Sequence, residues 1–183
     1  MASVQYYAAA SLDGYIARPD GAIDWLQRYG ADAGLGDGPM QDGSMDEFYA
    51  GVGSLVMGAA TYEWILEHAS AWPYDLPAFV VTHRRLPQPP GGEVRFEKGK
   101  AADIHADAME AAGGKNVWFV GGGRLAADWA KHKLIDEIIV TVVPVYIGDG
   151  LPFFAGAVDG ELRHTSTKTH ANGMVELRFA MPK

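Results

Sequence analysis

The stretch NVWFVGGGRLAADWAKHKLIDEIIVTVVPVYI, residues 116–147, decides the fold of this chain. An apolar run stops at three consecutive glycines, a helical pattern follows, and a second long apolar run closes the stretch. The pattern predicts a strand over Asn116–Val120, a helix over Leu125–Lys133 and a strand over Glu137–Ile147. Glycine gives up more conformational freedom on folding than any other residue. Three glycines at a strand end therefore indicate that something must approach the backbone closely there.

The same alternation of strand and helix patterns extends over most of the chain. Further strands are predicted at Val4–Ala10, Ser54–Met57, Ala78–Thr82 and Val94–Glu97, and helices at Met45–Val52, Thr61–His68 and 101–114. After residue 147, an alternation of polar and apolar residues about Asn172-Gly173 predicts an antiparallel hairpin. This order is typical of one α/β domain over residues 1–183, with a mainly parallel sheet and an antiparallel C-terminal edge.

Composition and charge narrow the class of function. Fifteen basic against twenty-three acidic side chains give a net charge of −8, which disfavours nucleic acid as a partner. No apolar run nears the roughly 20 residues that span a bilayer. The start of the chain has no basic segment ahead of an apolar one, so we expect a cytoplasmic protein without a membrane partner. Cysteine is absent, which excludes disulfides and thiolate catalysis, and the histidines lack metal-ligand spacing, so no metal site is predicted.

Ligands of parallel sheets bind at the carboxyl ends of the strands, so the segments after strands carry the candidate site. GGGRLA, residues 121–126, matches G-x-G-x-x-[GA] at a strand-to-helix junction, where unpaired N–H groups favour a phosphate and Arg124 adds a charge. MGAATYE, residues 57–63, repeats the junction with Gly58 and Thr61. VVTHRR, residues 80–85, ends a third strand with Thr82, His83, Arg84 and Arg85.

These junctions also have less specific interpretations. The glycines would serve in tight turns that bind nothing, and the basic segment would be a solvated turn. A Rossmann fold is disfavoured because Asp136 and Glu137 begin the next strand instead of ending it. Taken together, the three junctions favour a dinucleotide, with an extra phosphate near His83 and Arg84 that indicates NADPH over NADH. Residues 30–44, rich in Gly and Asp, are either a surface loop or a loop that folds over a ligand.

In this order the junctions resemble the dihydrofolate reductase-like superfamily, and most closely the C-terminal reductase domain of the bifunctional riboflavin-biosynthesis deaminase-reductases. The motifs that carry the resemblance are AASLDGYIA (9–17), DW (24–25), MGAATYE (57–63), VVTHR (80–84), VWFVGGGRLAADW (117–129) and IDEIIVTVVPVYIGDGLPFF (135–154). The resemblance implies a three-layer fold, with helices on both faces of the sheet, and NADPH across the strand ends.

It also assigns residues to the coenzyme. Backbone groups of Ala8 and Ala9 would lie near the nicotinamide, beside a loop that holds Leu12, Asp13 and Gly14. Two helix N-termini would hold the phosphates, one with Gly58, Ala60 and Thr61 and the other with Gly121, Gly122, Gly123, Arg124 and Leu125. A cis peptide is implied at Gly121-Gly122 or Gly122-Gly123. Ala59 stands where the family often has Arg, so we expect Thr82, His83 and Arg84 to supply the missing phosphate contact.

For the substrate, the resemblance implies a helix carboxylate, Asp46 or Glu47, and we expect a buried carboxylate there to act as the acid. Asp13 is either a catalytic residue or a turn-former. Trp25, Phe48 and Trp72 are either apolar walls of the substrate site or core residues. The expected activity is NADPH-dependent reduction of a C=N or C=O group in a small heterocyclic, pterin-like or ribosylamino-pyrimidine substrate, similar to 5-amino-6-(5-phosphoribosylamino)uracil reductase. The sequence has no H-x-E or cysteine pair of a zinc deaminase. The alternatives are dihydrofolate reductase activity, disfavoured by a short spacing from the helix carboxylates to Gly58, and a silent nucleotide-binding scaffold. A homodimer is also implied.

Overall fold

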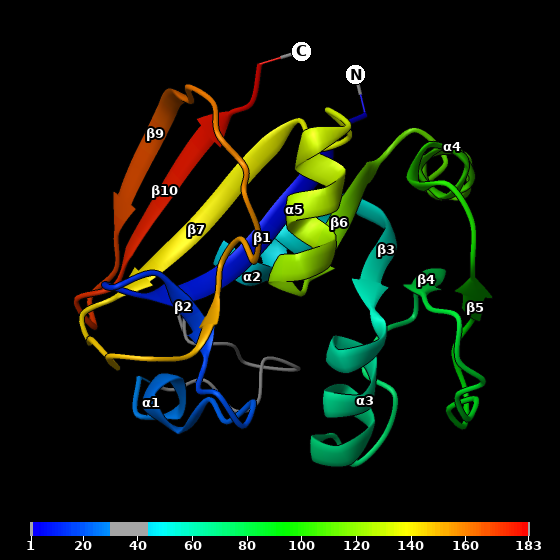
Figure 1. Ribbon diagram of the computed structural model, residues 1–183, viewed down its shortest axis with the longest axis horizontal. Coiled ribbons are helices and arrows are strands. Elements are labelled where there is room, and N and C mark those ends of the chain that lie inside the picture. The colour runs from blue at the N-terminus through cyan, green and yellow to red at the C-terminus, as the bar shows by residue number, and fades with distance from the viewer. Residues whose placement is uncertain (1, 30–43, 183) are drawn as a thin grey trace.

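The computed structural model describes residues 2–29 and 44–182, so nearly all of the loop predicted at 30–44 lies outside the described residues. Within them the chain forms an eight-stranded sheet in the order β5-β4-β3-β6-β1-β7-β10-β9 (Figure 1). Strands β5 to β7 in this order are parallel to one another, and β10 is antiparallel to both of its neighbours. The strands are β1 (Val4–Ser11), β3 (Val52–Gly58), β4 (Ala78–Val81), β5 (Val94–Glu97), β6 (Asn116–Gly121), β7 (Glu137–Val143), β9 (Arg163–Thr169) and β10 (Val175–Ala180). The predicted mainly parallel sheet with an antiparallel hairpin is confirmed.

Helices cover both faces of the sheet, because successive strand side chains point to opposite faces. Val4 and Tyr6 of β1 pack in one buried cluster with α4 and α5, whereas Tyr7 packs in another with α2 and α3. The helices are α1 (Asp24–Gln27), α2 (Ser44–Ala50), α3 (Ala59–His68), α4 (Ala101–Ala111) and α5 (Gly123–Lys131). The predicted three-layer arrangement is therefore confirmed. No helix among residues 2–29 and 44–182 is long and apolar enough to cross a bilayer.

Two boundaries differ from the sequence prediction. Strand β7 ends at Val143 and not at Ile147, because Pro144 follows, lacks the N–H that a ladder needs and turns the chain. Helix α5 begins at Gly123 and not at Leu125, so the third glycine is already helical. The segment after β7 returns to the loop after β1, where β2 (Tyr15–Ala17) and β8 (Leu151–Pro152) pair as a small second sheet that the sequence did not predict.

The C-terminal hairpin forms at the predicted dipeptide. Gly173 has a φ of +86°, a left-handed conformation that glycine adopts without cost, and His170 accepts its N–H at 3.0 Å. Strand β10 fills the space between β7 and β9, while every residue of β9 is exposed. The hairpin therefore extends the sheet beyond the region that the helices cover.

Candidate active site

Two helix N-termini lie side by side at the carboxyl edge of the sheet. Strands β3 and β6 are parallel neighbours, with Val56 opposite Phe119 and Met57 opposite Gly121. Each strand runs through a glycine into a helix, β3 into α3 after Gly58 and β6 into α5 after Gly122 (Figure 1). Neither helix has a side-chain cap, so the first N–H groups of both keep their hydrogen-bonding capacity. Backbone N–H groups at two neighbouring helix N-termini favour the binding of an anion.

The glycines of this edge meet one another. A Cβ atom placed on Gly58 would lie about 4 Å from the Gly121 carbonyl oxygen and the Gly122 nitrogen. One on Gly122 would lie 3.5 Å from the hydroxyl of Thr61. The peptide bond between Gly121 and Gly122 is cis, one of the two positions that the sequence predicted. Gly58, Thr61, Gly121 and Gly122 are thus brought together as predicted, with Leu125 in the same contact.

Gly123 has a different reason for being glycine. A Cβ there would lie 2.1 Å from the Pro152 carbonyl oxygen and 3.0 Å from that of Phe153. The Gly123 carbonyl in turn accepts the N–H of Ala155 at 3.0 Å. Gly123 is buried under the 152–155 segment, so its absent side chain serves backbone packing, although it was predicted to bind the coenzyme.

Cationic and polar side chains border this edge. Arg124 is exposed on the first turn of α5, and Ala60 is exposed on the first turn of α3. After β4, His83 and Arg84 are exposed, and the Thr82 hydroxyl accepts the Arg84 N–H at 3.0 Å. The Arg84 guanidinium is paired at 2.5 Å with Glu63 on α3. The basic turn therefore lies against the helix whose N-terminus carries Gly58.

The loop after β1 is tied to the loop after β7. Asp13 accepts the N–H groups of Ile147 at 3.1 Å and Gly148 at 2.7 Å, and Leu12 donates its N–H to Val145 at 2.7 Å. Hydrogen bonds to Asp13, first from Ser11 and then from those two amides, lower the pKa of its carboxyl group. These bonds give Asp13, predicted as catalytic, a role in holding the two loops together.

The other residues predicted in the first strand and its turn are accessible to a ligand. Ala8 and Ala9 are partly exposed, and Gly14 turns the chain with a φ of +88°. Leu12 is 70% exposed, an unusual state for leucine that leaves an apolar side chain at the edge.

The residues predicted to hold the substrate divide into three groups. Trp25 is 2% exposed and packs with Val143 and Met174, which assigns it to the core and not to a substrate wall. Asp46 and Glu47 are exposed on α2, so the expectation of a buried carboxylate on this helix does not hold. Phe48 is buried against the Tyr7 ring at 4.8 Å, and it borders a cavity together with Glu47.

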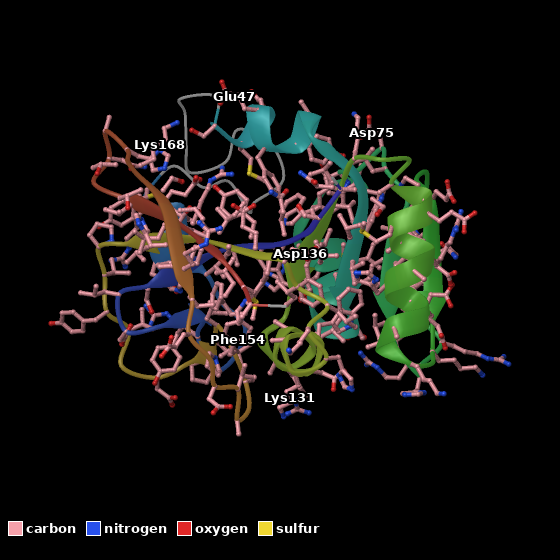
Figure 2. All side chains as sticks on the ribbon, turned by 90° about the horizontal axis from the view of Figure 1, so that it is seen from above. Glu47, Asp75, Lys131, Asp136, Phe154 and Lys168 are labelled. Carbon is pink, nitrogen blue, oxygen red and sulfur yellow. The ribbon has the colours of Figure 1, made fainter. Side chains whose placement is uncertain are left out.

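This cavity, of about 430 Å³, lies between α2 and the C-terminal hairpin. Figure 2 shows Glu47 on α2 and Lys168 on β9 at the same end of the molecule, and both line it. The Lys168 ammonium group contacts the Ser44 hydroxyl, which joins β9 to the first turn of α2. The cavity also exposes Gln5, Glu176 and Arg178, none of which the sequence singled out. Polar residues alternating along a strand ordinarily face solvent, so the pattern of β10 gave no signal of this lining.

Over residues 2–29 and 44–182, no three His, Asp or Glu side chains are grouped so that they could hold a metal ion.

Comparison with known proteins gives a consistent family. A model of the RibD C-terminal domain matches residues 102–175. The uncharacterized protein YwjB of Bacillus subtilis (strain 168) is 35% identical over 155 residues, which is 81% of this chain and 80% of YwjB. A solved protein of Shewanella sp. PV-4, whose name suggests a role in riboflavin biosynthesis, is 29% identical with a TM-score of 0.79, over 99% of both chains.

Two more distant structures share the fold. A dihydrofolate reductase from Enterococcus faecalis, solved with NADP(H), is 14% identical with a TM-score of 0.69, over 99% of this chain and 97% of that one. A diaminohydroxyphosphoribosylaminopyrimidine deaminase/5-amino-6-(5-phosphoribosylamino)uracil reductase from Thermotoga maritima is 13% identical with a TM-score of 0.63. That match covers 99% of this chain and 57% of the Thermotoga chain. The fold is therefore that of the dihydrofolate reductase-like proteins.

Proposed function

This chain belongs to the RibD C-terminal domain family, and from that premise we propose that it is an NADPH-dependent reductase of a small heterocycle of the ribosylamino-pyrimidine or pterin kind. The observation that carries the proposal is the pair of uncapped helix N-termini, α3 and α5, at neighbouring strand ends. The names of two related structures favour the same chemistry, since one is a uracil-derivative reductase and the other holds NADP(H).

The residues present fit a dinucleotide. A diphosphate carries two negative charges and needs several N–H donors, which two adjacent helix N-termini provide. Gly58 and Gly122 leave room for it, because neither has a Cβ above the first helical amides. Arg124 is exposed at the same edge and offers a charge-assisted hydrogen bond. Arg84, which pairs with Glu63 on α3, and His83 are exposed, and in this proposal they bind a second phosphate, the group that distinguishes NADPH from NADH.

When bound, NADPH would supply a hydride to the carbon of a C=N or C=O group, and the substrate nitrogen or oxygen would take up a proton from water. The chain contributes the positions of the partners. Ala8 and Ala9 offer partly exposed backbone at the end of the central strand, and Leu12 offers an apolar surface that excludes water. Asp13 keeps Leu12 in place by anchoring the adjoining loop.

A titration tests the proposal directly. Quenching of protein fluorescence by NADPH should give a dissociation constant in the micromolar range or below, because helix-terminus and arginine contacts to phosphate combine. R124A should weaken binding about tenfold, or ~1.4 kcal/mol. The matched control K131A changes an exposed cation in the last turn of the same helix and should leave affinity unchanged. No binding at millimolar NADPH would exclude the proposed coenzyme, and equal affinity of R124A and wild type would remove Arg124 from the site.

Turnover identifies the substrate. Loss of NADPH absorbance at 340 nm should be followed with 5-amino-6-(5-phosphoribosylamino)uracil and, separately, with dihydrofolate. We expect turnover of the first. Turnover of dihydrofolate alone would make the chain a dihydrofolate reductase, and tight NADPH binding with no turnover of either would leave a nucleotide-binding scaffold or a reductase of another heterocycle.

A further inference from the structure

The two faces of the C-terminal hairpin differ in the reverse of the usual way. Side chains alternate along β10, so Glu176 lies on one face, and on the other lie Val175, Leu177 and Phe179. Glu176 is 4% exposed and accepts the Tyr7 hydroxyl at 3.0 Å, which places it on the side of the sheet that α2 covers. The apolar side chains therefore lie on the opposite side, where an antiparallel hairpin ordinarily presents polar residues to solvent.

Strand β7 continues this apolar face. The register places Val140 beside Leu177 and Val142 beside Val175. All of these side chains are half-buried, and none belongs to a buried cluster of the described residues; together with Phe179 they are called the hairpin face below. Figure 1 shows α5 over the middle of the sheet and no described helix in front of β7, β10 or β9. The hairpin face is thus a continuous apolar surface that no described helix covers.

We propose that a second copy of this chain packs on the hairpin face, sheet against sheet, to form a dimer. Continuous apolar surface on a folded protein marks an interaction site. A two-fold interface pairs a patch with itself, so a patch of one charge sign repels its copy and an uncharged patch does not. The hairpin face carries no charge, and Thr167 and Thr169 continue it on β9, opposite Leu177 and Val175. A second copy therefore fits this surface, although each copy has a net charge of −8.

The edge of β9 is less suited to the same partner. Pairing through this edge would place two β9 strands side by side, and each strand carries Arg163 and Lys168, which adds like charges along the contact. The pairing of β9 with β10 is also irregular between Arg178 and Phe179, and bulges at the edge of a sheet oppose regular pairing with another strand. The observations therefore favour the hairpin face over the edge.

The proposed contact leaves the coenzyme edge open. The hairpin face belongs to β7 and β10, whereas the coenzyme is proposed to bind at β3 and β6, and β1 lies between the two pairs of strands. Sheets that pack face to face lie about 10 Å apart, which lets apolar side chains of both sheets interdigitate. Dimer formation should therefore not depend on NADPH, and it can fail or succeed independently of the proposed function.

Sedimentation velocity tests the inference. Wild type at micromolar concentration should sediment with twice the mass of one chain. L177D places a charge between Val140 and Thr167, and it should weaken the dimer roughly tenfold or more, because the charge would be buried without a partner, while the affinity for NADPH stays unchanged. The control S166D changes an exposed residue that pairs with Arg178 on the other side of the hairpin, and it should remain dimeric. A monomeric wild type, or an L177D dimer as stable as that of wild type, would overturn the inference.

Single cysteines keep the test valid if L177D folds poorly, because the chain contains no cysteine of its own. Thr169 pairs with Val175 on the apolar side of β9, Ser166 lies on the other side, and both are exposed in the single chain. The thiol of T169C should react with a maleimide about tenfold more slowly in the dimer than in protein diluted to the monomer, since buried thiols are inert. The thiol of S166C should react equally in both. Equal rates for T169C would overturn the inference, and slowing of both thiols would overturn it in favour of pairing through the β9 edge.

Discussion

Two regions of this molecule, the edge at β3 and β6 and the cavity between α2 and the hairpin, are built from different groups. The edge at β3 and β6 is made of backbone, with uncapped amides and glycines that keep side chains away. The cavity between α2 and the hairpin is made of side chains, which come from α2, β1, β6, β9 and β10. A backbone site requires glycine at fixed positions beside a strand end, and such positions are visible along the chain. A side-chain site requires only that distant residues meet, and nothing local marks them.

The same comparison applies within the glycine triplet. Gly122 leaves its neighbours at ordinary contact distance, whereas Gly123 lies against the backbone of the 152–155 segment. The absence of a side chain at Gly122 leaves a surface open, whereas its absence at Gly123 allows two chain segments to contact each other. Substitutions can therefore separate ligand binding from packing.

The largest expected effect is on stability, at Gly123. A Cβ in G123A would meet a backbone oxygen 2.1 Å away, which cannot move as the end of a flexible side chain could. We expect a loss of about 3 kcal/mol or more in the free energy of unfolding. The melting temperature should fall by roughly 6–12 °C. G160A, where nothing lies within 4 Å of the added Cβ, is the matched control and should melt as wild type does. A melting temperature of G123A equal to that of the control would contradict the packing role.

The next effect is on affinity, at Gly58. An added Cβ would have only ordinary contacts, near 4 Å, so G58A should melt within a few degrees of wild type. Its methyl group would stand over the first amides of α3, and we expect NADPH to bind about tenfold more weakly, or ~1.4 kcal/mol. Fluorescence titration measures the affinity for NADPH, and thermal denaturation measures the stability. If G58A lost stability and kept its affinity for NADPH, Gly58 would be required for backbone packing, as Gly123 is, and not for coenzyme binding.

A smaller effect should come from Glu63. Its ion pair with Arg84 must loosen before the guanidinium can bind a second phosphate. E63Q should therefore bind NADPH roughly two- to fourfold more tightly, as expected for release of an exposed pair, and NADH with unchanged affinity. The control E67Q changes another exposed carboxylate of the same helix and should leave both affinities unchanged. An equal gain in affinity for NADPH and NADH would mean that Arg84 does not bind the extra phosphate of NADPH.

The smallest effect concerns Asp13 and pH. Its folded pKa is lowered, so its contribution to stability is present above the unfolded value of about 3.9 and is lost as pH falls through the folded pKa. D13N should be slightly less stable than wild type near neutral pH, and the difference should shrink in acid. The amide resonances of Ile147 and Gly148 should titrate with a midpoint below about 3.9 in wild type. A midpoint above that value would show that the carboxyl group is not held by these amides.

The fold could be predicted from sequence because its signals are local. Apolar runs ending in glycine marked β3 and β6, and Asn172-Gly173 marked the hairpin. Pro144 also carried the information that β7 ends early, although the apolar residues beyond it suggested a longer strand. The edge proposed to bind the coenzyme was predicted from the same signals.

The substrate side was harder for a physical reason. Trp25 has the chemistry of a ligand wall, but whether an aromatic ring faces a site or the core depends on packing with residues such as Met174, nearly 150 positions away in the chain. Glu176 looked like an ordinary solvent-facing residue of a hairpin. Its burial depends on Tyr7 and on α2, both distant in sequence.

The position of β1 at the centre of the sheet has a consequence for synthesis of the protein. Both of its neighbours come from the second half of the chain. The hydrogen bond from Ser3 to Asn116 spans 113 residues of sequence, and that from Val4 to Asp136 spans 132. This apolar segment thus remains without its partner strands until more than 100 further residues have been translated. Such high contact order slows folding and prolongs exposure of aggregation-prone surface. Chaperones that hold nascent chains should therefore engage residues 4–11 during this interval.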